Sequence, residues 1–256
     1  MNTKPLVTRI AAALTLSFVA LGSQAVTPTP IKNIVLVHGY FADGSGWQSV
    51  SNILTRDGYR VSVVQEPETS FEDDVKATRR VIDAQNGPSI LVGHSYGGAV
   101  VTEAGNDPKV AGLVYVAAFQ PNTGESPLVL TKKMPSATKA IAPTADGYLF
   151  LDPAHFHEDF AADLPADQAN FMALSQVMPA AQSFGTPITA AAWKTKPSWG
   201  VVATADRAIN PDLERFMTKR AGTKTIEINA SHAVYISHPE EVAKLIEQAA
   251  MGSNKS

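Results

Sequence analysis

The sequence predicts an α/β fold, built as a doubly wound, mostly parallel sheet with a helical cap insertion. Short runs of β-branched and apolar residues alternate with helix-like segments, which is the order that parallel sheets with right-handed crossovers require. A glycine-flanked serine turn separates one of these runs from the segment that follows it. The length of 256 residues and the hydrophobic content of 45% suit a single domain with a sizeable core.

Residues 1–25 differ from the rest of the chain and are typical of an export signal. Lys4 and Arg9 precede the apolar run 10–21, and small residues follow at the positions that a signal peptidase reads. A run of this length is too short to span a bilayer core, which needs about 20 helical residues, so we expect no permanent membrane anchor. Removing the segment takes away two positive charges and changes the net charge from -3 to -5. We therefore expect a periplasmic or secreted protein whose mature domain spans residues 26–256.

Six apolar runs are predicted to form the strands. The run 34–37 is continuously apolar and β-branched, which is typical of a strand covered on both faces, and the other five are interpreted in the same way. The six runs occupy residues 34–37, 61–64, 90–92, 110–116, 201–203 and 225–228. Helices are predicted between them over residues 47–56, 71–85, 96–105, 211–220 and 239–250, the last opening with Pro239 at a first helical position.

The segment of about residues 121–197 interrupts this alternation. It contains no convincing buried strand and is rich in Ala, Pro, Met and Phe, so we interpret it as a helical cap insertion. Its apolar side chains can line a lid over the sheet edge or pack as ordinary core. They are Phe160, Leu164, Phe171, Met172, Leu174 and Met178.

The residues Gly93-His94-Ser95-Tyr96-Gly97 match the pattern G-x-S-x-G between a predicted strand and a predicted helix. In that context the serine occupies a sharp turn, and glycine at the flanking positions lets strand and helix pass closely. A helix that begins directly after the serine also points its positive end at an oxyanion formed there. The pattern predicts Ser95 as a nucleophile. A Gly- and Ser-rich turn without chemistry is the alternative.

A serine hydroxyl needs a base, and this kind of fold places the residues in the chain order Ser, acid, His. Of the six histidines, His232 lies on the loop directly after the last predicted strand, where it can lean back toward Ser95. His238 immediately precedes Pro239 and is better explained as a helix cap. We predict His232 as the base.

The acid should lie at a strand end between Ser95 and the base. Asp206 follows the predicted strand that ends at Ala203, and we predict it as the acid. A structural ion pair with Arg207 is the alternative. Asp212 is better explained as a first-turn residue that interacts with the helix dipole.

An oxyanion needs two preorganised N–H donors. The first predicted strand ends in His38-Gly39-Tyr40, and the serine turn continues into Tyr96. We predict the backbone N–H groups of Tyr40 and Tyr96 as the oxyanion hole. A flexible strand-to-helix turn is the alternative interpretation of the glycines that follow the first strand.

Taken together, these residues resemble the α/β-hydrolase superfamily from about Ile34 to the C-terminal helix. The start at residues 38–39, the turn at 93–98 and the spacing of Asp206 and His232 are similar to a small serine esterase group. That group also contains plant methylesterases and hydroxynitrile lyases. The resemblance implies a cofactor-free fold with a helical cap between the sixth and seventh strands of the family's numbering.

Differences between this sequence and these relatives reduce the number of reactions expected. Hydroxynitrile lyases of the group carry Thr where this sequence has Gly39 and Lys where it has Ala233, so a lyase activity loses support. Other members of the superfamily use an Asp nucleophile where this chain has Ser95. Cofactor-free perhydrolases share the Ser-Asp-His set.

The leading hypothesis is a serine hydrolase that cleaves a small-molecule carboxylic ester through an acyl-enzyme intermediate. The alternatives are a small-molecule receptor that keeps the fold, or a lyase or perhydrolase on the same scaffold. The substrate and the oligomeric state are open.

Composition excludes several other classes. The chain has 21 Lys and Arg against 24 Asp and Glu without a basic block, so nucleic acid is not an expected partner. The absence of cysteine removes thiolate nucleophiles and Cys-ligated metals. His155 and His157 lie near three acidic residues, but their spacing fits no metal template, and we expect no metal.

Overall fold

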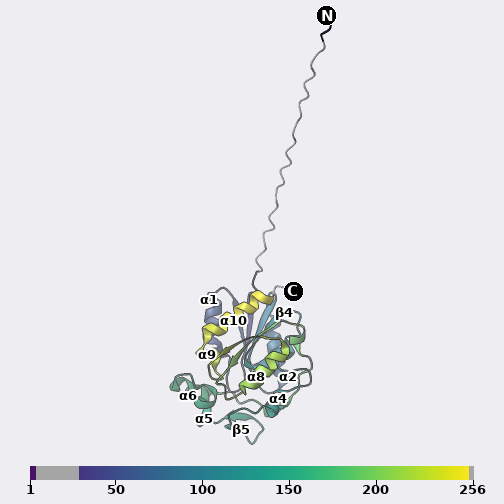
Figure 1. The fold of residues 1–256 in the computed structure, drawn as a ribbon. Coiled ribbons are helices and arrows are strands. Elements are labelled where there is room, and N and C mark those ends of the chain that lie inside the picture. Colours follow the sequence, from purple (N-terminus) through teal and green to yellow (C-terminus); the bar gives the residue numbers. More distant parts are fainter. Residues whose placement is uncertain (4–28, 254–256) are drawn as a thin grey trace.

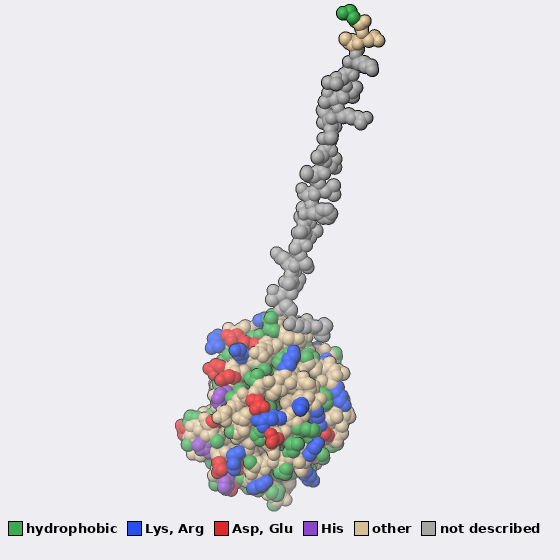
Figure 2. Space-filling model, in the orientation of Figure 1, with side chains coloured by type: hydrophobic (Ala, Val, Ile, Leu, Met, Phe, Trp, Pro, Cys, Tyr) green, Lys and Arg blue, Asp and Glu red, His purple; other side chains and the backbone are tan. Residues whose placement is uncertain are grey.

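The computed structural model describes residues 1–3 and 29–253. Most of the predicted export signal, including its expected cleavage position, lies outside the described residues. Within the described part of the chain, no helix combines the length and the hydropathy needed to cross a bilayer. Figure 2 shows acidic and basic side chains lying among one another on the face in view.

The domain is built on a six-stranded sheet in which every neighbouring pair is parallel. This confirms the predicted doubly wound α/β fold. The strand order is β2-β1-β3-β4-β7-β8. The strands are β1 (Asn33–Val37), β2 (Arg60–Val64), β3 (Ser89–Ser95), β4 (Val110–Ala118), β7 (Ser198–Ala203) and β8 (Lys224–Ile228).

Helices cover both faces of the sheet (Figure 1). α1, α9 and α10 pack on one face, while α2, α3 and α8 pack on the other. Their bounds are α1 (Gln48–Arg56), α2 (Phe71–Asp83), α3 (Gly97–Ala104), α8 (Pro211–Ala221), α9 (Val234–Ser237) and α10 (Pro239–Gly252). The first predicted helix begins one residue later than expected, because Trp47 closes the 3-10 turn η1 (Gly44–Trp47) instead.

Successive residues of the central strands point to opposite faces of the sheet, and the side chains on both faces are buried from solvent. In β1, Ile34 and Leu36 join the apolar cluster beneath α1 and α10, whereas Val35 and Val37 join the cluster beneath α2 and α3. All four are fully buried. Burial on both faces explains why this strand is a continuous apolar run in the sequence.

The chain between β4 and β7 leaves the sheet and forms most of its structure at one end of the domain, where α4, β5, α5 and α6 gather (Figure 1). Its helices are α4 (Pro127–Lys133), α5 (Pro153–Phe160), α6 (Ala166–Ser175), α7 (Ala181–Gly185) and the 3-10 turn η2 (Ala192–Lys194). It also contains an antiparallel hairpin, β5 (Ile141–Pro143) with β6 (Leu149–Leu151), which the sequence analysis did not predict. The insertion is therefore mainly, but not entirely, helical.

The six apolar side chains singled out in the insertion divide into three groups. Phe160 and Leu164 are buried in the core, and Met172 is partly buried and packs against it. Phe171, Leu174 and Met178 are 70%, 79% and 51% exposed, so they pack neither as core nor against the sheet edge.

Candidate active site

Ser95 ends β3 in a left-handed backbone conformation, with φ of +54°. Non-glycine residues rarely adopt this conformation, so the turn is strained, and such strain is held only where the surroundings fix it. The surroundings here are tightly packed backbone. A Cβ added at Gly93 would lie 2.5 Å from the carbonyl oxygen of Gly97, and one added at Gly97 would clash with the carbonyl of His38. The glycines of the G-x-S-x-G pattern are therefore required by close contact between β1, β3 and α3.

His232 lies on the loop after β8, and its ring Nδ1 is 2.5 Å from Oδ2 of Asp206. Both side chains are buried. Because a carboxylate only accepts hydrogen bonds, the proton of the neutral ring sits on Nδ1 and the lone pair on Nε2. No described residue hydrogen bonds this Nε2, although it is buried. The predicted base and acid are thus in contact, and the ring presents a free basic nitrogen.

The position of Asp206 is fixed by its own loop. Its Oδ1 accepts hydrogen bonds from the N–H groups of Ala208 at 2.7 Å and Ile209 at 2.9 Å, which leaves Oδ2 for the histidine. Arg207 does not pair with Asp206; it binds Asp159 at 2.7 Å. The alternative of an Asp206–Arg207 ion pair is therefore wrong.

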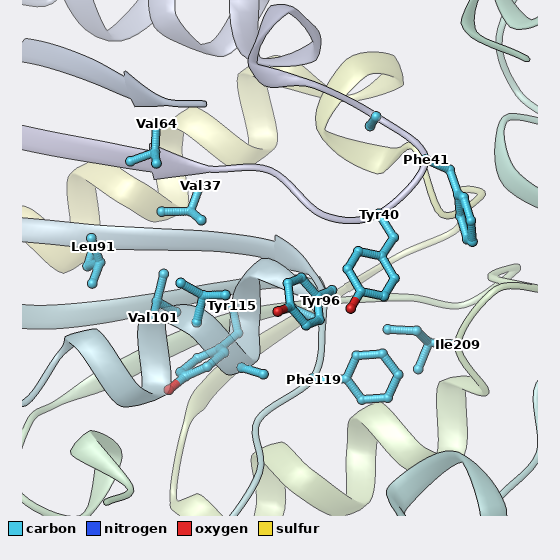
Figure 3. Packing of buried hydrophobic residues seen from close by; sticks show 14 of the residues in the cluster. Val37, Tyr40, Phe41, Val64, Leu91, Tyr96, Val101, Tyr115, Phe119 and Ile209 are labelled. Carbon is cyan, nitrogen blue, oxygen red and sulfur yellow. The ribbon is translucent and has the colours of Figure 1, made fainter. Parts of the chain in front are cut away.

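Ser95 and His232 line one cavity of about 90 Å³. Most of the wall is aromatic or aliphatic, and it includes Tyr40, Phe119 and Ile209, which lie close together in Figure 3. None of the described residues that line the cavity is Lys, Arg, Asp or Glu.

The two residues predicted to supply the oxyanion hole lie side by side. The rings of Tyr40 and Tyr96 stack with centroids 4.0 Å apart (Figure 3). The Tyr40 hydroxyl shares a hydrogen bond of 2.5 Å with Oγ of Ser183, and the Tyr96 hydroxyl donates to Asp74 at 2.9 Å. The residue before Tyr40 also touches the backbone of Tyr96, because a Cβ added at Gly39 would lie 3.1 Å from the Tyr96 nitrogen. The Gly39–Tyr40 backbone therefore runs beside the turn at Ser95.

A cluster of buried acidic groups lies beneath these tyrosines, and the sequence analysis missed it. Glu66 and Glu68 follow β2 and are almost completely buried, and their carboxylate oxygens have no well-formed hydrogen bond from a described group, although Nδ1 of His38 lies 3.5 Å from Oε1 of Glu68. Burial raises the pKa of Glu66 well above its usual range and that of Glu68 to about 7, although His38 partly offsets the second shift. Burial also raises the pKa of Asp74, against the hydrogen bond from Tyr96. The run Gln65-Glu66-Pro67-Glu68 directly after a strand was the available signal.

The arrangement of His38, Glu66 and Glu68 brings three possible metal ligands within 4.8 Å of one another. However, Nε2 of His38 already accepts a hydrogen bond of 3.0 Å from the Glu66 N–H. The ring proton therefore sits on Nδ1, 3.1 Å from the Gly39 carbonyl, and neither nitrogen has a lone pair for a metal. The cluster fits protonated carboxylic acids better than a metal centre.

The remaining histidines lie elsewhere or have other roles. His94 is buried, and burial lowers its pKa well below the usual range, so it is neutral. Its Nε2 lies 3.0 Å from the carbonyl oxygen of His232, so it helps to fix that loop. His155 and His157 lie on α5, and His238 precedes α10 and bonds Ser237.

A family model described as alpha/beta hydrolase family matches residues 34–245. The chain belongs to the alpha/beta hydrolase family. It is 29% identical over 246 residues to a pyrethroid hydrolase of Sphingobium wenxiniae, covering 84% of this chain and 86% of that protein. It is 27% identical over 244 residues to methylesterase 9 of Arabidopsis thaliana, covering 83% and 95%.

The fold is also that of a solved pyrethroid hydrolase. That crystal structure matches with a TM-score of 0.75 and 25% identity, covering 88% of this chain and all of the other. The resemblance to a small esterase group that includes plant methylesterases is confirmed. The relatives are hydrolases and esterases, and the family supports a hydrolase here.

We expect the buried acids to make stability depend on pH. The Glu68 pKa is near 4.5 in the unfolded chain and about 7 in the fold, so the unfolded state loses its proton first as pH rises. Stability should therefore fall between about pH 5 and 7 and then level off, by an amount of up to ~3 kcal/mol. Glu68→Gln removes this loss, so the variant should gain stability over the wild type at pH 8 relative to pH 5.

Urea unfolding at the two pH values measures this difference. Glu240→Gln, at an exposed glutamate of α10, is the matched control and should follow the wild type at both. A wild type and a Glu68→Gln variant whose difference in stability is the same at pH 5 and pH 8 would contradict the expectation.

Proposed function

We propose that the protein is a serine hydrolase that cleaves a small carboxylic ester through an acyl-enzyme intermediate. The observation that carries the proposal is that His232 lines the same cavity as Ser95, while Asp206 binds its Nδ1 and no described residue hydrogen bonds its Nε2. This is the arrangement in which a histidine can take a proton from a serine hydroxyl.

In the proposed reaction, Oγ of Ser95 attacks the acyl carbon and passes its proton to Nε2 of His232. The N–H groups of Tyr40 and Tyr96 bind the oxyanion of the tetrahedral intermediate. The imidazolium then protonates the leaving alcohol, and the acyl group stays on the serine. Water then attacks the acyl carbon and passes a proton to the same histidine. The bond to Oγ of Ser95 breaks, the serine takes that proton from the histidine, and the carboxylic acid is released.

The cavity favours an uncharged, apolar acyl group. A charged group would enter without a partner, because the described lining offers no charged side chain other than a protonated His232, and an unpaired buried charge is costly. The relatives named as a pyrethroid hydrolase and a methylesterase are consistent with an ester substrate.

Phe41 lies between this cavity and a second one. It lines both the Ser95 cavity and an outer groove of about 210 Å³ that runs along α6, where Phe171 and Met172 form part of the wall. Since the inner cavity holds only a small group, we propose that the alcohol part of a larger ester extends past Phe41 into this groove.

Ser95→Ala should lower ester hydrolysis on the order of a million-fold and leave the fold intact, because the nucleophile is lost while the turn keeps its glycines. Hydrolysis of short p-nitrophenyl esters and the far-UV circular dichroism spectrum measure the two effects. Ser51→Ala, on α1, is the control. A wild type that a fluorophosphonate probe does not label would indicate a small-molecule receptor instead of a hydrolase.

His232→Ala should reduce hydrolysis by several orders of magnitude, and His238→Ala should leave it near the wild-type rate. The two residues are six positions apart, but only His232 lines the Ser95 cavity. A proton acceptor must come within roughly 2.6 to 3.2 Å of the hydroxyl it serves. If His238→Ala were the inactive variant, the assignment of the base would be wrong.

We also propose that the protein is exported and acts in the periplasm or outside the cell. The support is the sequence of residues 1–25, with two basic residues before an apolar run and small residues before the expected cut. Mature protein recovered from an exporting host should begin at Val26, as N-terminal sequencing would show. An exported form that retains residues 1–25 would contradict this.

A further inference from the structure

A second buried carboxyl group lies behind the predicted acid. Glu214 is on α8, in the turn that follows the Asp206 loop, and only 1% of its surface is exposed. Its Oε2 accepts a hydrogen bond of 3.3 Å from the N–H of Ala203, the last residue of β7. The carbonyl of that same Ala203 accepts the N–H of Asp206 at 3.2 Å. A single residue, Ala203, therefore contacts the Glu214 carboxyl group through its N–H and the backbone of Asp206 through its carbonyl.

After the observed hydrogen bonds are counted, Asp206 can accept one more hydrogen bond, and one oxygen of Glu214 has no partner among the described residues. Asp206 accepts three hydrogen bonds, from two loop N–H groups and from His232, whereas a carboxylate can accept about four. The Oε1 of Glu214 is buried, and no described donor reaches it. A proton on Glu214 would satisfy both groups, because the acid could then donate to Asp206.

Electrostatics decide which acid carries the proton. Two carboxylates cannot both be ionised at such a site without a large cost, and one pKa rises strongly. Asp206 has three N–H donors that stabilise its charge, while Glu214 has one. Burial, the charge of Asp206 and a hydrogen bond to it together raise the pKa of Glu214 well above its usual range.

We infer that Glu214 is a positioning residue: a neutral carboxylic acid that donates a hydrogen bond to Asp206 and holds that carboxylate against His232. The hydrogen bond itself does not require the proposed function, but the expected effect on kcat rests on it. The inference extends the Ser95, His232 and Asp206 set by one group that touches neither substrate nor the reacting atoms.

Two substitutions test whether Glu214 acts through a hydrogen bond that it donates or through a negative charge. Glu214→Gln keeps the size and an N–H donor but can never ionise, so its kcat and KM should stay within about threefold of the wild type, and the midpoint of its kcat/KM profile against pH should not move. Glu214→Met has similar size and no donor. It should lower kcat by roughly 10- to 100-fold, as loss of a supporting hydrogen bond does at other sites, with KM little changed.

A downward shift of the profile in Glu214→Gln would overturn the inference, because it would mean that Glu214 is ionised in the wild type and helps His232 bind a proton. Equal losses of activity in the Gln and Met variants would also overturn it, since the donor would then not matter.

An infrared difference spectrum gives a readout that needs no activity. The wild type minus Glu214→Gln should show the carbonyl band of a protonated carboxylic acid near neutral pH, and a carboxylate band instead would refute the inference even if Glu214→Met fails to fold. The wild-type reaction with a fluorophosphonate probe distinguishes the two failures. A labelled enzyme with an ionised Glu214 removes only this inference, whereas an unlabelled enzyme removes the proposed function.

Discussion

The site depends on one close contact, in which the backbone after β1 touches the turn after β3. Gly39 packs so tightly there that an added Cβ would lie 2.6 Å from Cβ of Ser95. Ser95 has a left-handed conformation at this contact, and the contact places Gly39, the residue before Tyr40, against Ser95, the residue before Tyr96. The strained turn at Ser95 and the approach of the Gly39–Tyr40 backbone to it are therefore consequences of the same close packing. Neither could form if the first and third strands were not neighbours in the sheet.

Buried acidic groups support the site from two sides. Asp74 accepts a hydrogen bond from the Tyr96 hydroxyl, with Glu66 and Glu68 close behind it, while Glu214 lies behind Asp206. Burying a carboxyl group is costly when it is charged, and burial raises the pKa of Glu66 and Glu214 well above the usual range. Asp206 differs from these two in accepting three hydrogen bonds, two from loop N–H groups and one from Nδ1 of His232.

Much of this architecture was predictable because it depends on local signals. Short runs of apolar and β-branched residues identified the six strands of the sheet, and the serine pattern with its glycines located the tight turn between β3 and α3. Chain order, together with positions directly after predicted strands, indicated Asp206 and His232 as partners, and they are in contact. The hairpin β5–β6 gave no such signal, since each strand has three residues, only one of the six is buried, and one of them is Pro143. Glu214 was equally hidden, because a glutamate in the first turn of a helix is usually a solvated partner of the helix dipole. Its burial depends on how α8 packs against β7.

The division between sheet and insertion explains how such a site can change its substrate without losing its chemistry. The groups proposed to react are fixed by strands β1, β3, β7 and β8, which are buried or paired along their length. The insertion contributes Phe160 and Phe184 to the wall of the cavity and leaves Phe171 and Leu174 exposed beyond it. Substitutions at Phe184, Phe171 or Leu174 alter the shape and the apolar area that an ester meets without removing a hydrogen bond of Asp206 or the backbone contact at Gly39. Phe160 belongs to both parts, because its ring lies 4.8 Å from that of His232 and its carbonyl accepts the N–H of Ala233 at 3.0 Å. Selectivity can therefore vary at the outer positions of the insertion, while reactivity is constrained by packing.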